Sequence, residues 1–301
     1  MTSTDVTFGA VWDTAQTEYK DSNSVKSFSN KVAAITGAGS GIGRALARAL
    51  ADEACDLALS DVDEAGLAET VRLLKDSGVR CTTRRLDVAD RAVVHEWADE
   101  VVREHGKVNL IFNNAGVALG ATVEGMSDAD FEWLMNINFW GVAYGTRAFL
   151  PHLKAAGEGH VINISSVFGL ASMPTQGAYN AAKFAVRGLT ESLRIELDMQ
   201  DCGVSATCVH PGGIKTSIAR NARTDASMSS VGLDQTDSQS KMEKTFTTTP
   251  ERAAQVILRA VRGNKRRALI GADAHLIDLM VRCLGAQYQP VVSFLTRKLM
   301  S

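Results

Sequence analysis

Tyr179 and Lys183 stand one turn apart on a predicted helix, so that their side chains lie on the same face. A free phenol has a pKa of about 10 and is a poor base at neutral pH. A neighbouring ammonium in a partly desolvated site stabilises the phenolate and lowers that pKa. The pair therefore predicts a phenol that donates and accepts protons near neutral pH. The ordinary alternative is the face of an amphipathic helix.

Ser165 and Ser166 follow the strand-like run "HVINI" shortly before that helix. A serine hydroxyl can bind a reacting oxygen and stabilise the negative charge that develops on it. Ser166 is the candidate for this role. Ser165 would point to the opposite face if the strand continued regularly.

A glycine-rich turn, "TGAGSGIG", joins the first predicted strand to the first predicted helix. Glycines let the backbone approach a pyrophosphate closely, and the N-terminus of the helix offers it free N–H groups. The turn alone is weak evidence, because ordinary turns also contain glycine. The expected phosphate-binding residues are Gly37, Ser40, Gly41, Ile42 and Gly43.

Asp61 ends the next predicted strand, where an acidic residue would reach the ribose hydroxyls of a bound dinucleotide. A carboxylate there repels a 2′-phosphate, and no Arg or Lys stands inside the glycine loop or just after Asp61. The sequence therefore favours NAD over NADP. The alternative for Asp61 alone is a helix cap.

Short apolar runs alternate with helical patterns along most of the chain, which is typical of βαβ units. We expect one α/β domain, a Rossmann-like doubly wound fold with a seven-stranded, mostly parallel sheet and helices on both faces. The expected strands are Lys31–Thr36, Asp56–Asp61, Arg80–Val88, Val108–Gly116, His160–Ser166, Val204–Gly213 and Arg266–Gly271. Long helices are expected at Asp128–Lys154 and Gln176–Met199.

Three regions follow from this pattern: a polar N-terminal extension (1–29), the Rossmann domain (30–272) and a helical C-terminal extension (273–301). A short helix is expected near Val11–Tyr19. The polar segment 217–248 is expected to be a mobile substrate lid, with small helices inside it as the alternative. Thr249 and Pro250 predict the start of a late helix.

Composition excludes several classes of function. The chain has 301 residues, a net charge of -2 and no basic run, which argues against nucleic-acid binding. The five cysteines are scattered without metal-ligand spacing, so we expect no metal, no disulfide framework and a reducing, cytoplasmic location. The apolar C-terminal stretch from Leu276 is interrupted by charged residues, Gly285 and Pro290. We expect two short packed helices there, with membrane contact as the less favoured alternative.

Taken together, the motifs resemble the short-chain dehydrogenase/reductase family of the Tyr-x-x-x-Lys type. The resemblance rests on "TGAGSGIG", "LDV", "NNAG", Asn138, Ser166, Tyr179, Lys183 and "PGG" in this order. It is close from Lys31 to Thr216 and looser up to Gly271.

The resemblance implies four catalytic residues: Tyr179 as proton donor and acceptor, Lys183 as its pKa-lowering partner, Ser166 and Asn138. The lysine also holds the nicotinamide ribose, and the asparagine supports a water of the proton relay. Further contacts to the cofactor are implied for Asp87, Val88, Asn114, Ala115, Gly116, Pro211, Gly212, Ile214 and Thr216.

The implied reaction is hydride transfer between NAD and a secondary alcohol or ketone. An apolar substrate is expected from the candidate pocket residues Val167, Phe168, Leu170, Met173, Ile218 and Met228. The family also implies a homodimer or homotetramer formed through the two long helices. Two other functions stay open: a dinucleotide-binding sensor without catalysis, and an enzyme similar to the nucleotide-sugar epimerases.

Overall fold

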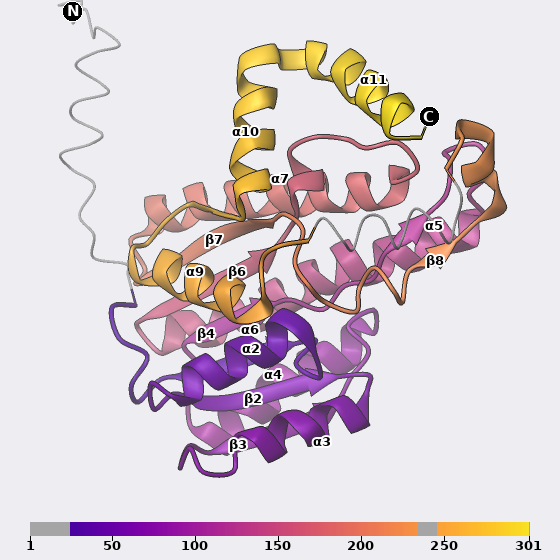
Figure 1. Ribbon diagram of the computed structural model, residues 1–301. Coiled ribbons are helices and arrows are strands. Elements are labelled where there is room, and N and C mark those ends of the chain that lie inside the picture. Colours follow the sequence, from indigo (N-terminus) through magenta and orange to yellow (C-terminus); the bar gives the residue numbers. More distant parts are fainter. Residues whose placement is uncertain (1–24, 234–245, 301) are drawn as a thin grey trace, which may run out of the picture.

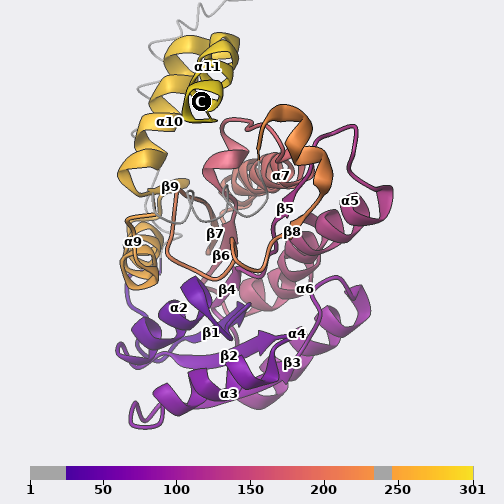
Figure 2. The same cartoon turned by 45° about the vertical axis from the view of Figure 1, so that its right-hand side comes forward.

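Seven parallel strands form the central sheet of the computed structural model, in the order β3-β2-β1-β4-β6-β7-β9 (Figures 1 and 2). The structure describes residues 25–233 and 246–300, so the helix expected near Val11–Tyr19 lies outside the described residues. The strands are β1 Val32–Thr36, β2 Asp56–Asp61, β3 Cys81–Arg85, β4 Leu110–Asn113, β6 Gly159–Ile164, β7 Val204–Pro211 and β9 Arg267–Ile270. The predicted doubly wound fold is confirmed.

Helices cover both faces of the sheet (Figures 1 and 2). One face carries α2 Gly41–Ala51, α3 Glu64–Leu73 and α9 Pro250–Arg262, and the other carries α4 Arg91–His105, α6 Gly141–Ala155 and α7 Gly177–Gln200. Within β1, Ile35 packs toward α2 and α9, whereas Ala34 packs in the core on the side of α4 and α6. Burial on both faces explains why the central strands β1 and β4 are almost continuously apolar, whereas the edge strand β3 is polar and partly exposed.

The domain also includes residues from the expected polar extension. Val25 and Phe28 are fully buried in the core beside α2 and α9. The guanidinium of Arg262 lies 4.7 Å from the centre of the Phe28 ring. The packed part of the chain therefore includes residues before position 30.

The predicted long helix Asp128–Lys154 is continuous but not uniform. It consists of α5 Asp128–Met135, a π-helical turn Asn136–Trp140 and α6. A π turn inside an α-helix changes the direction in which the following side chains point, and such turns are frequent at functional sites. This one contains Asn138.

A second, two-stranded parallel sheet was not predicted. β5 Leu119–Gly120 pairs with β8 Arg223–Thr224, which belongs to the expected lid. The short 3-10 helix Ala226–Val231 follows, as the alternative of small helices anticipated. The described beginning of the segment is thus held by strand pairing, and residues 234–245 lie outside the description.

The C-terminal extension forms an arm of two helices, α10 Ala272–Leu284 and α11 Tyr288–Met300, joined by the short turn Gly285–Gln287. Figures 1 and 2 show α10 projecting from the body and α11 turning at its end. Thr249 caps α9 as predicted, since its hydroxyl accepts a hydrogen bond from the Arg252 N–H at 3.2 Å. Among the described residues, no helix combines the length and apolar character that crossing a membrane requires.

Candidate active site

The glycine-rich loop leaves an open helix N-terminus at the carboxyl edge of the sheet. Gly37 and Gly41 have φ angles of +67° and +52°, and a Cβ at Gly43 would lie 2.1 Å from the Gly37 carbonyl oxygen. Ser40 is the N-cap of α2 but makes no side-chain hydrogen bond to it. In α3, α4, α5 and α9, by contrast, the side chain of the N-cap residue accepts a hydrogen bond from a backbone N–H of the helix. Free N–H groups and a loop without side chains fit a bound phosphate.

Asp61 lies beside this loop at the end of β2. Its Oδ2 accepts a hydrogen bond from the Gly39 N–H at 2.8 Å, and its Oδ1 accepts one from the Asp63 N–H at 3.0 Å. Asp63, not Asp61, caps α3, so the helix-cap alternative for Asp61 is wrong. Each oxygen of Asp61 retains a lone pair that a ribose hydroxyl can use.

Arg44, in the first turn of α2, also reaches this corner and was not among the predicted site residues. Its guanidinium donates to the carbonyl oxygens of Gly39 and Gly66, and its Nε donates to the Thr70 hydroxyl at 3.0 Å. The side chain thus ties the glycine loop to α3.

Asn114 joins the end of β4 to the same loop. Its Nδ2 donates to the carbonyl oxygens of Thr36 and Gly37 at 2.9 and 3.1 Å. The N–H groups of Asn114 and Ala115 both donate to the Thr36 hydroxyl at 3.0 Å. These bonds hold the crevice between β1 and β4, where strand order reverses and where ligands bind in such sheets.

Asp87 and Val88 follow β3 at this edge. Asp87 is exposed and accepts a hydrogen bond from the Ala89 N–H at 2.9 Å. Val88 is buried, and a Cβ at Gly141 would lie 2.7 Å from one of its methyl groups. Both residues lie at the edge of the sheet that carries the glycine loop.

Tyr179, Lys183 and Ser166 meet where α7 passes the end of β6. The Lys183 Nζ lies 5.4 Å from the centre of the Tyr179 ring and donates to the Ile164 carbonyl oxygen at 3.0 Å. The Ser166 hydroxyl accepts a hydrogen bond from the Phe168 N–H at 3.1 Å and is close enough to the Tyr179 phenol to lower its pKa. The sequence spacing therefore corresponds to a real cluster.

Asn138 reaches this cluster from the π turn. It is fully buried, and its amide both accepts from the Val117 N–H and donates to the Val117 carbonyl, each at 2.8 Å. A Cβ at Gly116 would lie 3.2 Å from the Asn138 Oδ1 and 3.6 Å from the Lys183 Nζ. Because Gly116 has no side chain, the space between the asparagine oxygen and the lysine ammonium is left free at this position.

Ser165 does not follow the strand alternation, because β6 ends at Ile164. Its hydroxyl donates to the Lys183 carbonyl oxygen at 2.8 Å. Ser165 thus fastens α7 to the sheet next to the catalytic candidates.

In the chain alone, the pKa values of Tyr179 and Lys183 are both shifted from their ordinary values. Burial raises the pKa of Tyr179 to about 12, against a smaller lowering by the hydrogen bond with Ser166. Burial also lowers the pKa of Lys183 to about 8. In the chain alone the Lys183 ammonium is directed at the Ile164 carbonyl oxygen. The predicted lowering of the phenol pKa includes the positive charge of an oxidised cofactor and stays a prediction for the occupied site.

The loop after β7 passes close to the glycine loop. The Gly212 N–H, just after Pro211, donates to the Ile270 carbonyl oxygen at 2.9 Å. A Cβ at Gly41 would lie 3.1 Å from the Thr216 methyl group. Ile214 packs in the core with 5% of its surface exposed, which leaves its backbone as the part available to a cofactor.

The candidate substrate residues separate into several environments. Val167, Leu170 and Met228 are buried, with 5%, 3% and 5% of their surfaces exposed. The Phe168 ring stands edge-on to Tyr179, with 5.9 Å between ring centres. Ile218 is half-buried.

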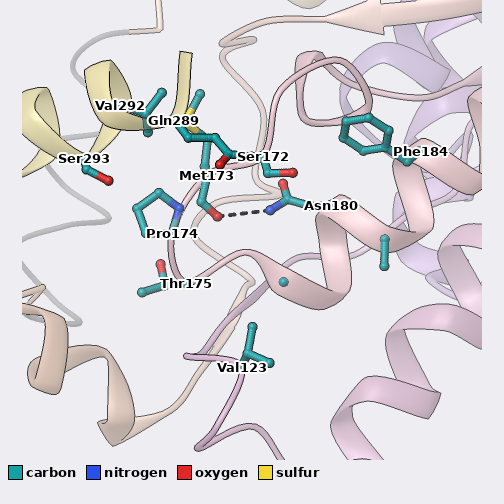
Figure 3. A pocket seen from close by; sticks show the side chains of 12 residues that line it. Val123, Ser172, Met173, Pro174, Thr175, Asn180, Phe184, Gln289, Val292 and Ser293 are labelled. Atoms are coloured by element: carbon teal, nitrogen blue, oxygen red, sulfur yellow. Dashed lines mark hydrogen bonds between the residues drawn. The ribbon is translucent and has the colours of Figure 1, made fainter. Parts of the chain in front are cut away.

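Met173 lines an open groove of about 610 Å³ between the start of α7 and α11 (Figure 3). Its other walls include Val123, Phe184 and Val292. The Asn180 Nδ2 donates to the Met173 carbonyl oxygen at 3.0 Å, which fixes one side of the groove. Sequence reasoning did not identify the contribution of α11.

A family model described as short chain dehydrogenase matches residues 31–227. The chain belongs to the short-chain dehydrogenase family. A relative in this family is SadH of Mycobacterium tuberculosis, named as an oxidoreductase, with 47% identity over 270 residues that cover 89% of this chain and 96% of SadH.

Two solved short-chain dehydrogenase structures are also similar. A Burkholderia phymatum protein in complex with NAD shares 33% identity with a TM-score of 0.80, covering 89% of this chain and 96% of that one. A Thermococcus sibiricus alcohol dehydrogenase complexed with 5-hydroxy-NADP shares 27% identity with a TM-score of 0.66, covering 80% and 95%. The chain is therefore an oxidoreductase of this family.

Proposed function

We propose that this short-chain dehydrogenase transfers a hydride between NAD and a secondary alcohol or ketone, with Tyr179 as the acid and base. The observation that carries the proposal is the meeting of Ser166, Tyr179 and Lys183 beside Asn138. A dinucleotide-binding protein without catalysis has no need of this cluster next to its glycine loop.

In the reductive direction, a bound nicotinamide cofactor supplies the hydride to the carbonyl carbon of the ketone. The Tyr179 hydroxyl donates its proton to the carbonyl oxygen, and the Ser166 hydroxyl holds that oxygen. In the oxidative direction, the Tyr179 phenolate removes the hydroxyl proton of the alcohol. The proton and the hydride together account for the two hydrogens that separate alcohol from ketone.

Lys183 and Asn138 support Tyr179 in this scheme. In the chain alone the Lys183 ammonium donates a hydrogen bond to the Ile164 carbonyl oxygen. It stabilises the phenolate once a bound ligand weakens that hydrogen bond. Positive charge on the oxidised cofactor favours the phenolate further. Asn138 keeps the backbone at Val117 in place through both ends of its amide.

NAD is the cofactor that this corner of the site favours. The Asp61 carboxylate faces the position expected for the ribose hydroxyls and would repel a 2′-phosphate. The guanidinium of Arg44 donates to the carbonyl oxygens of Gly39 and Gly66 and to the Thr70 hydroxyl. These bonds would compete with a 2′-phosphate for the guanidinium. The NAD complex of the Burkholderia phymatum relative supports this preference, whereas the Thermococcus sibiricus enzyme carries an NADP derivative.

An apolar substrate is proposed because the Phe168 ring stands edge-on to Tyr179, with 5.9 Å between ring centres. The charged side chain over the Tyr179 ring, Lys183, belongs to the catalytic cluster. A homo-oligomer formed through the helices of 128–155 and 177–200 is proposed from the resemblance and from exposed apolar side chains on α5, on the π turn and on α7. The five free cysteines agree with a reducing compartment such as the cytoplasm.

The proposal is tested by following NADH and NADPH oxidation with a panel of cyclic, aliphatic and steroidal ketones and of small charged keto acids. We expect turnover with apolar ketones and a higher kcat/KM with NADH. Faster turnover of charged keto acids would contradict the proposed substrate class. Tight NADH binding without turnover of any compound would favour the sensor, and activity only on nucleotide sugars would favour the epimerase-like enzyme.

A further inference from the structure

The C-terminal arm, defined as α10, the turn Gly285–Gln287 and α11, touches the loop after β6 and the loop after β7. The Asp273 Oδ2 accepts a hydrogen bond from the Gly213 N–H, in the loop after β7, at 2.6 Å. The Tyr288 hydroxyl accepts one from the Ser172 N–H, in the loop after β6, at 2.9 Å. One element therefore holds the backbone of both loops.

Two glycines, Gly212 and Gly271, pack directly against the Asp273 carboxylate. A Cβ at Gly212 would lie 2.1 Å from the Asp273 Oδ2, and a Cβ at Gly271 would lie 2.3 Å from its Oδ1. Gly271 also has a φ of +100°, which other residues rarely adopt. The loop backbone and the carboxylate are thus fitted to each other, because no other residue type leaves that space.

The arm is anchored at its base by a chain of ion pairs. Arg267 of β9 donates to Glu191 of α7 at 2.8 Å and to Asp278 of α10 at 3.1 Å. Asp278 also pairs with Arg282 at 2.7 Å. These contacts link α7, which carries Tyr179, to the arm.

The middle of the arm, where α11 begins after the turn, is anchored by packing. Tyr288 and Val292 are buried in a cluster with Ala171 and the partly buried Met173, both in the loop after β6. Figure 3 shows Val292 and Gln289 on α11 facing the Ser172–Thr175 part of that loop across the groove. The arm is therefore held at its base by charge and at its turn by apolar contact.

We propose that the arm is part of the active site and that Asp273 and Tyr288 are positioning residues. Asp273 holds the loop Pro211–Thr216 in the shape that receives the nicotinamide end of the cofactor. Tyr288 holds the loop that runs from Ser166 to α7 in the shape that receives the substrate. The inference rests on the proposed function, because it needs a nicotinamide cofactor and a substrate beside Tyr179.

Binding of NADH and of ADP-ribose, which lacks the nicotinamide, tests the role of Asp273. We expect D273A to weaken NADH binding about 10-fold, since hydrogen bonds to charged groups are the stronger class, and to leave ADP-ribose binding unchanged. D273N should restore most of the NADH affinity, because its amide oxygen can still accept from Gly213. L276A, an exposed position on the same helix, is the control and should change neither affinity.

Equal weakening of both ligands by D273A, or no weakening of NADH, would overturn the role of Asp273. Wild-type protein that binds ADP-ribose and NADH equally tightly would also overturn it. If the wild type binds neither, the proposed function itself fails and the role of the arm fails with it.

The substrate side is tested with Y288F, which removes the acceptor for the Ser172 N–H and keeps the ring. We expect the KM for the best ketone to rise about 5-fold while the Kd for NADH stays unchanged. Q287A, in the exposed turn of the arm, is the matched control. An unchanged KM for the ketone, or a KM and NADH Kd that rise together, would overturn the role of Tyr288.

Discussion

The protonation states of Tyr179 and Lys183 decide whether the site favours ketone reduction or alcohol oxidation. In the chain alone the phenol is protonated, since burial raises its pKa to about 12. A protonated phenol is the form that reduces a ketone, because it has a proton to give. Oxidation of an alcohol needs the phenolate and therefore depends on how far the bound cofactor lowers this pKa.

The two directions should accordingly respond to pH with opposite sign. Between about pH 6 and about pH 10, kcat for alcohol oxidation should rise, by up to about 10-fold per pH unit before it levels off. Over the same range kcat for ketone reduction should stay level and then fall. Initial rates with saturating cofactor in both directions measure this. An oxidation rate that peaks below neutral pH would contradict the assigned role of Tyr179.

His210 gives a second pH dependence, in stability. Its Nδ1 is 2.9 Å from the Ser166 carbonyl oxygen, and its buried Nε2 has no partner among the described residues. Burial lowers its pKa from 6.5 to about 4. Between these values the unfolded chain binds the proton more tightly, so the free energy of unfolding falls as the pH is lowered through 6.5.

H210N should reduce that acid sensitivity, because the amide keeps a donor for Ser166 and cannot take up a proton. We expect the wild type to lose about 2 kcal/mol more than H210N between about pH 7 and about pH 5. Urea unfolding of both proteins at the two pH values provides the measurement. Parallel losses in the two proteins would show that His210 does not titrate in this range.

At the scale of elements, the glycine loop and α2 form the part of the site that depends most on close backbone contact. G43A would bring a methyl group against the Gly37 carbonyl oxygen, where only 2.1 Å is available. We expect NADH binding to fall at least 10-fold, because the loop must move away from the position that fits a phosphate. Fluorescence titration with NADH measures the loss.

R48G is a matched control for this experiment. Arg48 is an exposed residue of the same helix, and glycine there costs about 1 kcal/mol of helix stability without altering the loop. If R48G weakens NADH binding as much as G43A does, the effect comes from the stability of α2 and not from the shape of the loop.

The sequence could predict the elements that depend on local pattern. The strands that end at Thr36 and Asp61 and the Tyr179–Lys183 helix follow from apolar runs and from residue spacing. The pairing of β5 with β8 could not be predicted, because both strands are very short and far apart in the chain. The same holds for Asp273 and Tyr288, whose partners are backbone N–H groups that leave no mark in the sequence.

The raised pKa of Tyr179 also lay beyond the sequence. Spacing shows that a lysine is near a tyrosine, but it does not show that the ammonium is directed at a carbonyl oxygen or that both groups are desolvated. The direction of the ammonium and the loss of solvent from both groups depend on how the surrounding residues pack.

At the scale of the whole molecule, large apolar side chains are exposed on the π turn and on α7. Trp140, Phe184, Ile195 and Met199 expose 43%, 37%, 58% and 82% of their surfaces. Exposed apolar residues gathered on one set of helices are typical of protein–protein contacts. We expect the protein to be a homodimer or homotetramer through this surface.

The double variant I195K/M199K should dissociate that assembly. Light scattering after gel filtration should give the wild type a mass at least twice the chain mass of 32.2 kDa, and the variant a mass near 32.2 kDa. V71K, on α3 away from this surface, should behave as the wild type. A monomeric wild type would refute the expected assembly.

The most direct test of the central claim compares Y179F with the wild type in two measurements on the same preparations, NADH binding and ketone reduction. The account predicts an unchanged Kd for NADH and a kcat that falls by about 10²–10⁴-fold, because phenylalanine keeps the ring and removes only the proton donor. A Y179F protein that binds NADH and reduces the ketone at the wild-type rate would contradict the account.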